Sequence, residues 1–300
     1  MMPALDQDSL RGEMRYDEPL SRHTTGRVGG PASRYYRPAD REDLLTFLRQ
    51  LDPREPLFWL GLGSNLLVRD GGFKGTVIAT QGALNGLEMV TETRLRAEAG
   101  VACAMVARFA ARNGLCGVEF LAGIPGTMGG ALAMNAGAFG GETWERVRSV
   151  ETLDRHGEVR SRPPEDFAVS YRQVSGPEGE WFLAVEMELQ PGDGDAALEQ
   201  IQELLEKRAA TQPVGRPSCG SVFRNPEGDY AARLIEAAGL KGRTIGAACV
   251  SKKHANFILN NGGASASDIE QLIYEVQERV EKESGIRLQT EVHIVGKEVQ

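Results

Sequence analysis

The sequence predicts an α+β protein built from two or three domains. Its 300 residues are about twice the usual length of one domain, which is ample for a packed core. Segments with the alternation of β-strands recur along the chain, and amphipathic helical segments lie between them. Two segments rich in glycine, residues 61–75 and 122–141, separate some of the strands and are candidates for ligand-binding loops.

The first part of the chain predicts a small α/β lobe. Asp40 is placed to cap a helix in which Leu44, Leu45 and Leu48 recur at helical spacing. An apolar strand runs into the first glycine-rich segment, so a ligand is expected at the ends of the strands. The predicted elements are a loop at 21–31, a strand at 32–37, the helix after Asp40, and strands at 57–62 and 76–80.

A second lobe, mostly of strands, is predicted to follow. Its first two strands alternate as a hairpin does, and Gly114 marks the end of its helix. The sequence PGDGD at 191–195 interrupts the chain after the last strand. The predicted elements are a hairpin of 87–90 and 93–99, a helix at 102–113, the second glycine-rich segment, and strands at 147–153, 159–162 and 181–189.

The last third of the chain predicts a connecting helix and a compact α+β unit. The connecting helix spans 195–207 and places its apolar residues on one face, and the compact unit starts near Gln212. Ser267 and Glu270 are placed to form the capping box of a long amphipathic helix. The other predicted elements are a helix at 230–240, a strand at 257–260 and a last strand at 287–295, in which Glu291 and His293 share a face.

The second glycine-rich segment carries seven glycines and no charged residue. Glycine lets the backbone approach another molecule closely, and free amides at a turn or a helix start bind phosphate. Two interpretations stay open, a cradle for a nucleotide pyrophosphate and a glycine-rich turn packed against a neighbouring element. The chain has no GxxxxGK[ST] motif and no GxGxxG motif that opens a helix after a strand.

Composition argues against several classes of protein. The formal net charge of -8 disfavours a nucleic-acid partner, and the uncharged run at 120–141 is too rich in glycine, proline and asparagine to span a membrane. Residues 1–18 contain acidic residues and no apolar stretch, so no signal peptide is expected. The four cysteines show no CxxC or metal-finger spacing and the four histidines form no HExxH motif, which indicates a reducing compartment and no metal site.

Six segments of the chain follow one another in an order that resembles a known enzyme family. They are GLGSNLLV, GIPGTMGGALAMNAGAFG, SYR, GSVFRNP, KHANFILN and EVHIVG. One such motif is weak evidence by itself, but six in the same order are strong evidence. From about Tyr16 to Gly296, the chain resembles the UDP-N-acetylenolpyruvoylglucosamine reductases, the flavoenzymes of bacterial peptidoglycan precursor synthesis.

The resemblance implies an α+β protein with a two-lobed FAD-binding fold of the vanillyl-alcohol-oxidase (PCMH-like) type and a C-terminal substrate domain. It implies a cytoplasmic oxidoreductase in which NADPH reduces non-covalent FAD, and the reduced flavin converts UDP-N-acetylglucosamine enolpyruvate to UDP-N-acetylmuramate. The implied enzyme has a nucleotide-sugar as its partner and has no nucleic-acid or membrane partner. Its oligomeric state stays open, with a monomer favoured. The implied domains are a first FAD-binding lobe at 14–82, a second at 83–193, a connector helix at 194–211 and a substrate-binding domain at 212–300.

The flavin contacts implied by the resemblance fall on the two glycine-rich segments. A dinucleotide held by backbone amides and small hydroxyls needs little positive charge, which agrees with this composition. Neither segment contains the His or Cys that covalent attachment of a flavin requires. The implied contacts are Gly61, Gly63, Ser64, Asn65 and Leu66 in the first segment, and Gly123, Ile124, Pro125, Gly126, Thr127, Gly129, Gly130, Asn135, Ala136 and Gly137 in the second.

The resemblance also implies three catalytic residues. Hydride addition to the enolpyruvyl group pushes electrons toward its carboxylate, so the site must stabilise negative charge and then protonate the α-carbon. Arg172 is implied to bind the developing charge, Glu291 to share a proton or hydrogen bond with the same oxygens, and Ser221 to donate the proton. Without the motif order, the three would be interpreted as a surface arginine, a solvated glutamate and a turn serine.

Four further residues match family segments near the nucleotide-sugar, namely Tyr171, Asn225, Lys253 and His254. For His254, a hydrogen-bonded histidine at the entrance to a strand stays open as an alternative. Only eight residues separate Arg172 from Trp181, so the substrate-covering tyrosine loop of one subgroup is absent and the chain resembles the shorter, type II subgroup. Val174 stands where the family often has a serine, a difference that concerns one local hydrogen bond.

Two other classes of function compete with this one. A flavin oxidase of the same fold would act on an alcohol or an amine, and the missing His or Cys argues against its covalently flavinylated members. A flavin-binding or nucleotide-sugar-binding regulator would keep the glycine-rich segments, but it would have no reason to keep Arg172, Ser221 and Glu291 together.

Overall fold

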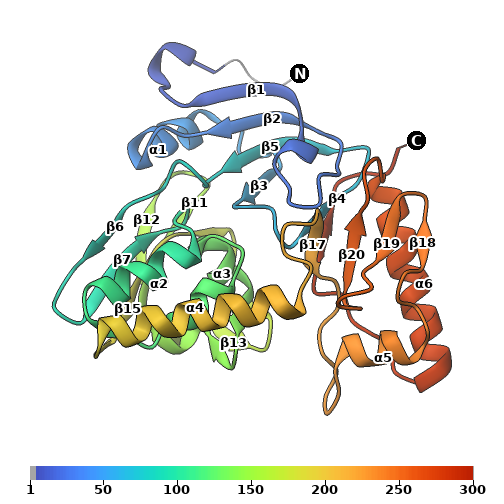
Figure 1. The fold of residues 1–300 in the computed structure, drawn as a ribbon. Helices are drawn as coiled ribbons and strands as arrows, with labels where there is room; N and C mark the ends of the chain where they lie inside the picture. Colours follow the sequence, from blue (N-terminus) through green and yellow to red (C-terminus); the bar gives the residue numbers. More distant parts are fainter. Residues whose placement is uncertain (1–4, 300) are drawn as a thin grey trace. The chain divides into compact units, whose positions relative to one another are not determined.

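The computed structural model describes residues 5–299, which form two compact units (Figure 1). Residues 1–4 lie outside the described residues. They belong to the segment 1–18, in which no signal peptide is expected. The four-part division implied by the resemblance stays a prediction. Contacts within the chain group the residues into two units instead. Unit 1 comprises the chain up to Arg15, residues 34–62 and residues 75–207, and unit 2 comprises residues 16–33, 63–74 and the chain from Arg208 onward.

A four-stranded sheet and helix α1 (Arg41–Gln50) form the first part of the fold. The carboxylate of Asp40 accepts a hydrogen bond from the amide of Asp43, and Leu44 and Leu48 are buried, so the predicted cap and helix are confirmed. The strand expected at 57–62 ends earlier, and the first strand of the sheet is not predicted. In spatial order, the strands are β1 (Glu13–Pro19), β2 (Pro31–Arg37), β5 (Phe73–Ala79) and β3 (Leu57–Leu60), with β3 and β5 parallel.

A five-stranded antiparallel sheet forms the rest of unit 1 with three helices. The hairpin and the three later strands predicted for the second lobe are confirmed here, because alternation marks each of them. The sheet order is β12 (Val159–Arg162), β11 (Val147–Asp154), β15 (Glu180–Glu188), β7 (Arg94–Glu98) and β6 (Leu87–Met89). The helices are α2 (Cys103–Arg112), α3 (Met128–Met134) and α4 (Gly194–Thr211), which runs on into unit 2.

Several short elements connect these layers, and the sequence does not predict them. Each is too short or too exposed to show a clear period. Two hairpins are of particular interest because they carry candidate site residues, namely β9 (Gly137–Ala138) with β10 (Gly141–Glu142), and β13 (Ala168–Ser170) with β14 (Gln173–Ser175). The others are the pair β8 (Leu115–Cys116) and β16 (Gln190–Pro191) and the 3-10 helices Gln7–Ser9, Leu20–Arg22, Glu119–Gly123, Thr143–Arg146 and Pro164–Asp166.

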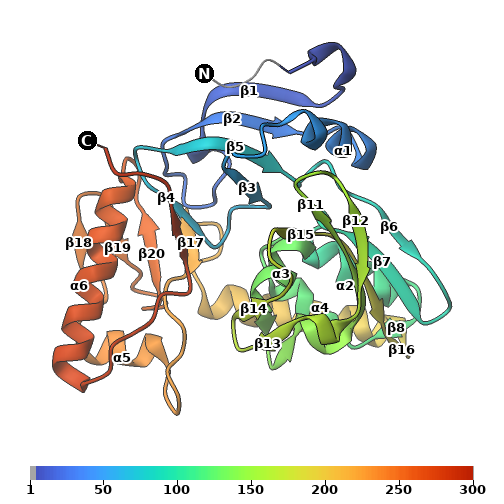
Figure 2. The ribbon, with the colours of Figure 1, turned by 180° about the vertical axis from the view of Figure 1, so that it is seen from behind.

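Unit 2 is an α+β layer in which helix α6 (Ala266–Ser284) covers a four-stranded sheet, as the view from behind shows (Figure 2). The apolar face predicted for this helix is buried, including Ile269, Leu272 and Ile273. The sheet order is β17 (Ser218–Ser221), β20 (Phe257–Asn260), β19 (Ala248–Val250) and β18 (Thr244–Ile245). The remaining elements are α5 (Ala231–Ala237) and the parallel pair β21 (His293–Val295) and β4 (Leu66–Val68).

Three predictions for these segments are wrong in detail. The capping box of α6 consists of Ser265 and Asp268 rather than Ser267 and Glu270, because the helix begins two residues earlier than the apolar period suggested. The last strand spans three residues instead of the predicted 287–295. The glycine-rich segments are not wholly loop, since the first contains β4 and the second contains α3 and the β9–β10 hairpin. Among the helices of residues 5–299, none is long and apolar enough to span a membrane.

Candidate active site

The second glycine-rich segment lies within unit 1 and forms helix α3 with the turns on either side. The amides of Met128 and Gly129, at the start of α3, donate to the carbonyls of Val101 (2.8 Å) and Ala99 (2.9 Å). The expectation of free amides at a helix start therefore fails at these two positions, because the fold itself uses them. Any dinucleotide held by this segment must use other groups as well.

Gly61, the first glycine of the other segment, approaches the start of α3 within unit 1. A Cβ atom on Gly61 would lie 2.4 Å from Oγ1 of Thr127, so this approach needs glycine. Thr127 is 2 % exposed, and its hydroxyl has no hydrogen-bond partner among residues 5–299. Such a group costs about 1–3 kcal/mol when it stays unpaired. The hydroxyl is therefore placed to bind an atom that the chain does not supply.

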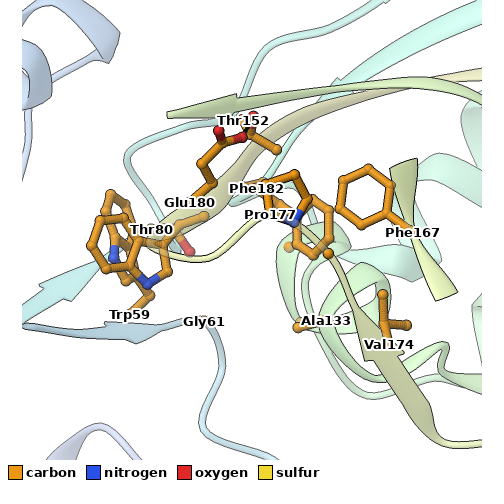
Figure 3. A pocket seen from close by; sticks show the side chains of 15 residues that line it. Trp59, Gly61, Thr80, Ala133, Thr152, Phe167, Val174, Pro177, Glu180 and Phe182 are labelled. Atoms are coloured by element: carbon orange, nitrogen blue, oxygen red, sulfur yellow. Dashed lines mark hydrogen bonds between the residues drawn. The ribbon is translucent and has the colours of Figure 1, made fainter. Parts of the chain in front are cut away.

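A cavity of ≈ 280 Å³ lies beside these glycines in unit 1 (Figure 3). Gly61, Gly129 and Gly130 form part of its lining, so a ligand there can approach the backbone. Aromatic side chains form much of the remaining wall, and the ring centroids of two of them, Trp59 and Trp181, lie 5.3 Å apart. This combination of bare backbone and aromatic rings is typical of a pocket for part of a nucleotide cofactor.

Glu180 brings a carboxylate to the wall of this cavity, but its own neighbours satisfy it. Its oxygens accept hydrogen bonds from Arg162 at 2.6 Å and from the hydroxyl of Thr152 at 2.5 Å. The contact with Arg162 lowers the pKa of Glu180, so the carboxylate is ionised at neutral pH. The wall therefore suits an uncharged ring better than a phosphate group.

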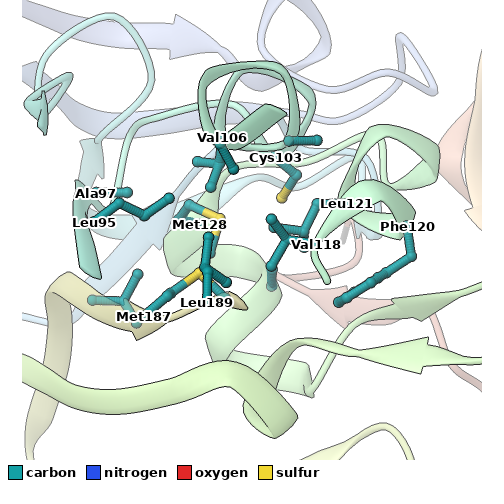
Figure 4. Packing of buried hydrophobic residues seen from close by; sticks show 14 of the residues in the cluster. Leu95, Ala97, Cys103, Val106, Val118, Phe120, Leu121, Met128, Met187 and Leu189 are labelled. Atoms are coloured by element: carbon teal, nitrogen blue, oxygen red, sulfur yellow. The ribbon is translucent and has the colours of Figure 1, made fainter. Parts of the chain in front are cut away.

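The position of α3 is fixed by the core of unit 1 (Figure 4). Met128 is fully buried at the start of the helix and shares this core with Leu95, Val106 and Met187. Because the first turn of α3 is anchored by packing and by its amides, the glycines of that turn face the cavity on a rigid element.

Arg172 occupies the turn between β13 and β14, also in unit 1. Its φ of 56° is unusual for a residue with a side chain, and such strain persists only where the surroundings enforce it. Its guanidinium donates to the carbonyls of Asn135 (3.2 Å) and Gly137 (2.8 Å) and is 15 % exposed. The structure thus brings Arg172 to two predicted site residues that lie 37 and 35 positions earlier in the sequence.

Asn135 ends α3 in the left-handed conformation and organises this corner of unit 1. Its side chain accepts from the amide of Trp144 (3.2 Å) and donates to the carboxylate of Glu142 (2.8 Å), which also lies 3.9 Å from Arg172. Glu142 is a contact of two candidate site residues, Asn135 and Arg172, that the sequence reasoning missed. The available signal was that it is the first charged residue after the uncharged run.

Ser221 and Glu291 lie together in unit 2. Ser221 ends β17, and the amide of Glu291 donates to the carbonyl of the next residue, Val222, at 2.8 Å. The side-chain amide of Asn65, in the first glycine-rich segment, donates to the carbonyl of Glu291 at 3.0 Å. Two of the three predicted catalytic residues are therefore neighbours in unit 2, and the third, Arg172, belongs to unit 1.

The rest of the first glycine-rich segment is also held within unit 2. Gly63 has a φ of +66°, and a Cβ atom there would lie 2.5 Å from the carbonyl oxygen of His23. Both the backbone conformation and the lack of space therefore require glycine. The carbonyl of Gly63 accepts from the amide of Thr25 (3.1 Å), and the hydroxyl of Thr25 donates to Ser218 (2.7 Å) in β17. The loop around Thr25, which the sequence reasoning left without a role, supports this segment. Of the remaining implied contacts, Leu66 is buried in β4, and Ser64 lies against Gly220.

The four implied substrate contacts have structural partners of their own. Asn225 accepts from the amide of Ala231 at the start of α5 (3.0 Å), and the ammonium of Lys253 donates to a carbonyl in α4. Nδ1 of His254 accepts from the amide of Asn256, and burial lowers the pKa of His254. Tyr171 is 44 % exposed beside Arg172. Within the described residues, no group of three or more His, Cys, Asp or Glu is arranged to hold a metal.

Comparison with known proteins defines the class of this protein. A family model described as "FAD binding domain" matches residues 32–161, and a model described as "UDP-N-acetylenolpyruvoylglucosamine reductase, C-terminal domain" matches residues 212–295. The chain is therefore a flavoprotein oxidoreductase that uses FAD, with an FAD-binding part and a separate C-terminal α+β domain. The fold class implied by the resemblance is confirmed.

Relatives over the whole chain define the family. The chain is 61 % identical over 295 residues to the UDP-N-acetylenolpyruvoylglucosamine reductase of Alkalilimnicola ehrlichii (98 % of this chain and 99 % of that one) and 62 % identical over 286 residues to that of Methylococcus capsulatus (95 % and 94 %). The crystal structure of the Thermus caldophilus enzyme superposes with a TM-score of 0.79 at 34 % identity, covering 95 % of this chain and 99 % of that one. This chain belongs to the UDP-N-acetylenolpyruvoylglucosamine reductase family.

The residues of unit 1 fit FAD. The unpaired hydroxyl of Thr127, the close approach of Gly61 and the aromatic cavity supply a donor, access to the backbone and an apolar wall. These are the features expected around a flavin dinucleotide that is held without covalent attachment.

Gly130 offers a test in which the stability of the fold and the affinity for FAD change in opposite directions. A Cβ atom there would meet only Thr127, at 3.8 Å, and Gly130 is a helical residue that lines the cavity. We expect Gly130→Ala to stabilise the FAD-free protein by about 0.5–1 kcal/mol, because alanine is the better helix former. The methyl group intrudes on the cofactor, so FAD affinity should fall by about 5- to 150-fold.

Thermal unfolding of the FAD-free protein and FAD titration measure these two effects. Gly129→Ala is the matched control, because a Cβ atom there would lie 2.9 Å from Cβ of Ala99 and should destabilise the fold itself. Wild-type FAD affinity in Gly130→Ala would show that Gly130 is not a cofactor contact.

Proposed function

We propose that the chain catalyses the NADPH-dependent reduction of the enolpyruvyl group of UDP-N-acetylglucosamine enolpyruvate to UDP-N-acetylmuramate, a step in the synthesis of peptidoglycan precursors. The observation that carries the proposal is the 61 % identity over 295 residues to an enzyme named for this substrate. The residues matched to the family's catalytic trio, Arg172, Ser221 and Glu291, support it.

In the proposed mechanism, bound FAD would supply the redox chemistry that carries hydride from NADPH to the enolpyruvyl group. Arg172 stabilises the charge that grows on the substrate carboxylate, with a planar guanidinium whose direction is set by the carbonyls of Asn135 and Gly137. Glu291 hydrogen-bonds the same oxygens. Ser221 protonates the α-carbon, a transfer that is feasible because the enolate-like carbon is a strong base.

The remaining parts of the proposal concern binding and location. The nucleotide-sugar contacts Tyr171, Asn225, Lys253 and His254, and FAD contacts the glycine-rich segments at the positions the resemblance implies. The protein acts as a cytoplasmic enzyme, with no nucleic-acid or membrane partner, and a monomer is favoured. The domains at 14–82, 83–193, 194–211 and 212–300 are proposed as functional units.

An anaerobic experiment with the purified yellow protein tests the reaction. We expect NADPH to bleach the flavin absorbance, and the enolpyruvyl nucleotide-sugar, added after excess NADPH is removed, to restore it with formation of an equal amount of UDP-N-acetylmuramate. The two half-reactions are thereby measured separately. If the flavin stays reduced until oxygen is admitted, the reductase proposal fails and a flavin oxidase or a flavin-binding regulator takes its place.

A further inference from the structure

Ser221 follows an irregularity at the edge of the sheet of unit 2. β17 pairs with β20, but the register between them shifts between Ser218 and Ser221, where Gly220 has a φ of 74°. An irregularity of this kind bends a strand and turns the next side chain in a new direction. Because β17 ends at Ser221, the direction of this side chain also depends on what holds the residues immediately after it.

The side chain of Asn256 holds those residues. Its Oδ1 accepts a hydrogen bond from the amide of Phe223 at 2.9 Å, and its Nδ2 donates to the carbonyl of the same residue at 2.8 Å. The main-chain carbonyl of Asn256 accepts from the amide of Val222 at 2.9 Å. Asn256 is 5 % exposed, so these bonds lie in a buried environment, where hydrogen bonds are stronger than in water. A side-chain amide thus continues the strand pairing two residues beyond Ser221.

The same contacts reach Glu291. The amide of Phe223 and the carbonyl of Val222 belong to one planar peptide group. Asn256 binds the N–H of this group, and the carbonyl of the group accepts from the amide of Glu291 at 2.8 Å. The residues matched to the proton donor and to the glutamate of the proposed reaction are therefore oriented through a single peptide group that Asn256 holds.

We propose that Asn256 is a positioning residue, which orients Ser221 and Glu291 for protonation of the substrate through the main chain of Val222 and Phe223. An amide suits this role, because it supplies an acceptor and a donor side by side and so matches the N–H and the C=O of one residue. The inference rests on the proposed function, which assigns the proton donor.

Asn256→Leu tests the inference in the FAD-bound enzyme, because leucine has a similar size and makes neither hydrogen bond. We expect anaerobic reduction by NADPH to stay within about twofold of wild type and reoxidation by saturating nucleotide-sugar to slow by about 10- to 100-fold, the effect of a small misplacement of reacting groups. The solvent deuterium isotope effect on reoxidation should rise, because the slowed step is the transfer of a proton. Both rate constants are measured per bound flavin, so a smaller amount of folded protein does not change them.

Asn260→Leu is the matched control, because it makes the same change in the same sheet at 7 % exposure. The side chain of Asn260 donates to the carbonyl of Gly26 at 3.1 Å and accepts from the amide of Gly262 at 2.9 Å, both outside the segment 221–223. This variant should lose stability but keep both half-reactions and the isotope effect of the wild type.

Hydrogen exchange gives a readout without turnover. The amide of Glu291 should exchange faster in Asn256→Leu than in the wild type and stay protected in Asn260→Leu, because only the first change loosens the peptide group to which this amide donates. If Asn256→Leu does not fold, Asn256→Ser replaces it, since a hydroxyl can still accept from the amide of Phe223. One neutral hydrogen bond is then lost, and reoxidation should slow by about tenfold.

Reoxidation at the wild-type rate in the folded variant, an equal fall of both half-reactions, or unchanged protection of the amide of Glu291 would overturn the inference. The wild type separates this result from a failure of the proposed function. A wild type that NADPH reduces and the nucleotide-sugar does not reoxidise refutes the proposed function and the inference with it. A wild type that is reoxidised at the same rate as the variant at Asn256 refutes the inference alone.

Discussion

Replacing Ser221 by alanine is expected to leave reduction of the flavin by NADPH within about twofold of wild type and to slow its reoxidation by the nucleotide-sugar by about 10²- to 10⁴-fold, the usual contribution of a positioned proton donor. The first half-reaction transfers hydride to the flavin and needs no proton from serine. The second must protonate the α-carbon of the substrate, and no acid replaces the lost hydroxyl in the alanine variant. Anaerobic stopped-flow absorbance measures both rates.

The fold around Ser221 does not depend on its hydroxyl. The carbonyl of Val222 accepts a hydrogen bond from the amide of Glu291, and the amide of Val222 donates to the carbonyl of Asn256. The side chain of Asn256 holds Phe223 by two further hydrogen bonds. Because these contacts use the backbone of β17 and the residues after it, Ser221→Ala should unfold at the wild-type temperature.

Ser218→Ala is the matched control, because Ser218 lies on the same strand and contacts Thr25 through its backbone. Its half-reactions should match those of the wild type. Reoxidation of Ser221→Ala at the wild-type rate would assign the proton to another donor, whereas a loss of flavin reduction in this variant would mean that Ser221 positions the cofactor instead.

The parts of the fold that could be predicted from the sequence are those with a local physical cause. Asp40 caps α1 because its carboxylate reaches an amide three residues away, and the apolar face of α6 recurs at helical spacing. The strands β13 and β17 have no such signal, since every residue of the first is exposed and the second contains Gly220 at positive φ. The assignment of residues 63–74 to unit 2 depends on the pairing of β4 with β21, more than 220 residues later, which no local pattern indicates.

The candidate site shows the same limit. The order of the motifs identifies Arg172, Asn135 and Gly137 as candidate site residues. The hydrogen bonds between them depend on how two hairpins pack in unit 1. Composition suggested free amides at the start of α3, whereas Met128 and Gly129 use theirs on Val101 and Ala99. The unpaired groups of Thr127 and Trp59 are visible only once the neighbours of each side chain are known.

Arg172→Lys is expected to keep FAD bound and to slow reoxidation by the nucleotide-sugar by about 10²- to 10³-fold, the effect typical of losing one preorganised donor to a developing anion. Arginine presents a planar fork of N–H donors. The carbonyls of Asn135 and Gly137 accept hydrogen bonds from the guanidinium of Arg172 and fix its direction. A lysine ammonium is a flexible point charge, so it retains the charge and loses the orientation. Reduction of the flavin by NADPH should change by less than about fivefold, because no carboxylate charge develops in that step.

The contact of Arg172 with two carbonyls also gives it a structural role, so the test must separate the two roles. FAD affinity and thermal unfolding report on the tie between the β13–β14 turn and the end of α3, and reoxidation reports on the substrate. Arg148→Lys, at an exposed position of β11 in the same unit, controls for the loss of a guanidinium. If FAD affinity and both half-reactions of Arg172→Lys fall together, Arg172 is only a structural tie. If reoxidation alone falls, the orientation of its guanidinium toward the substrate carboxylate is what the reaction requires.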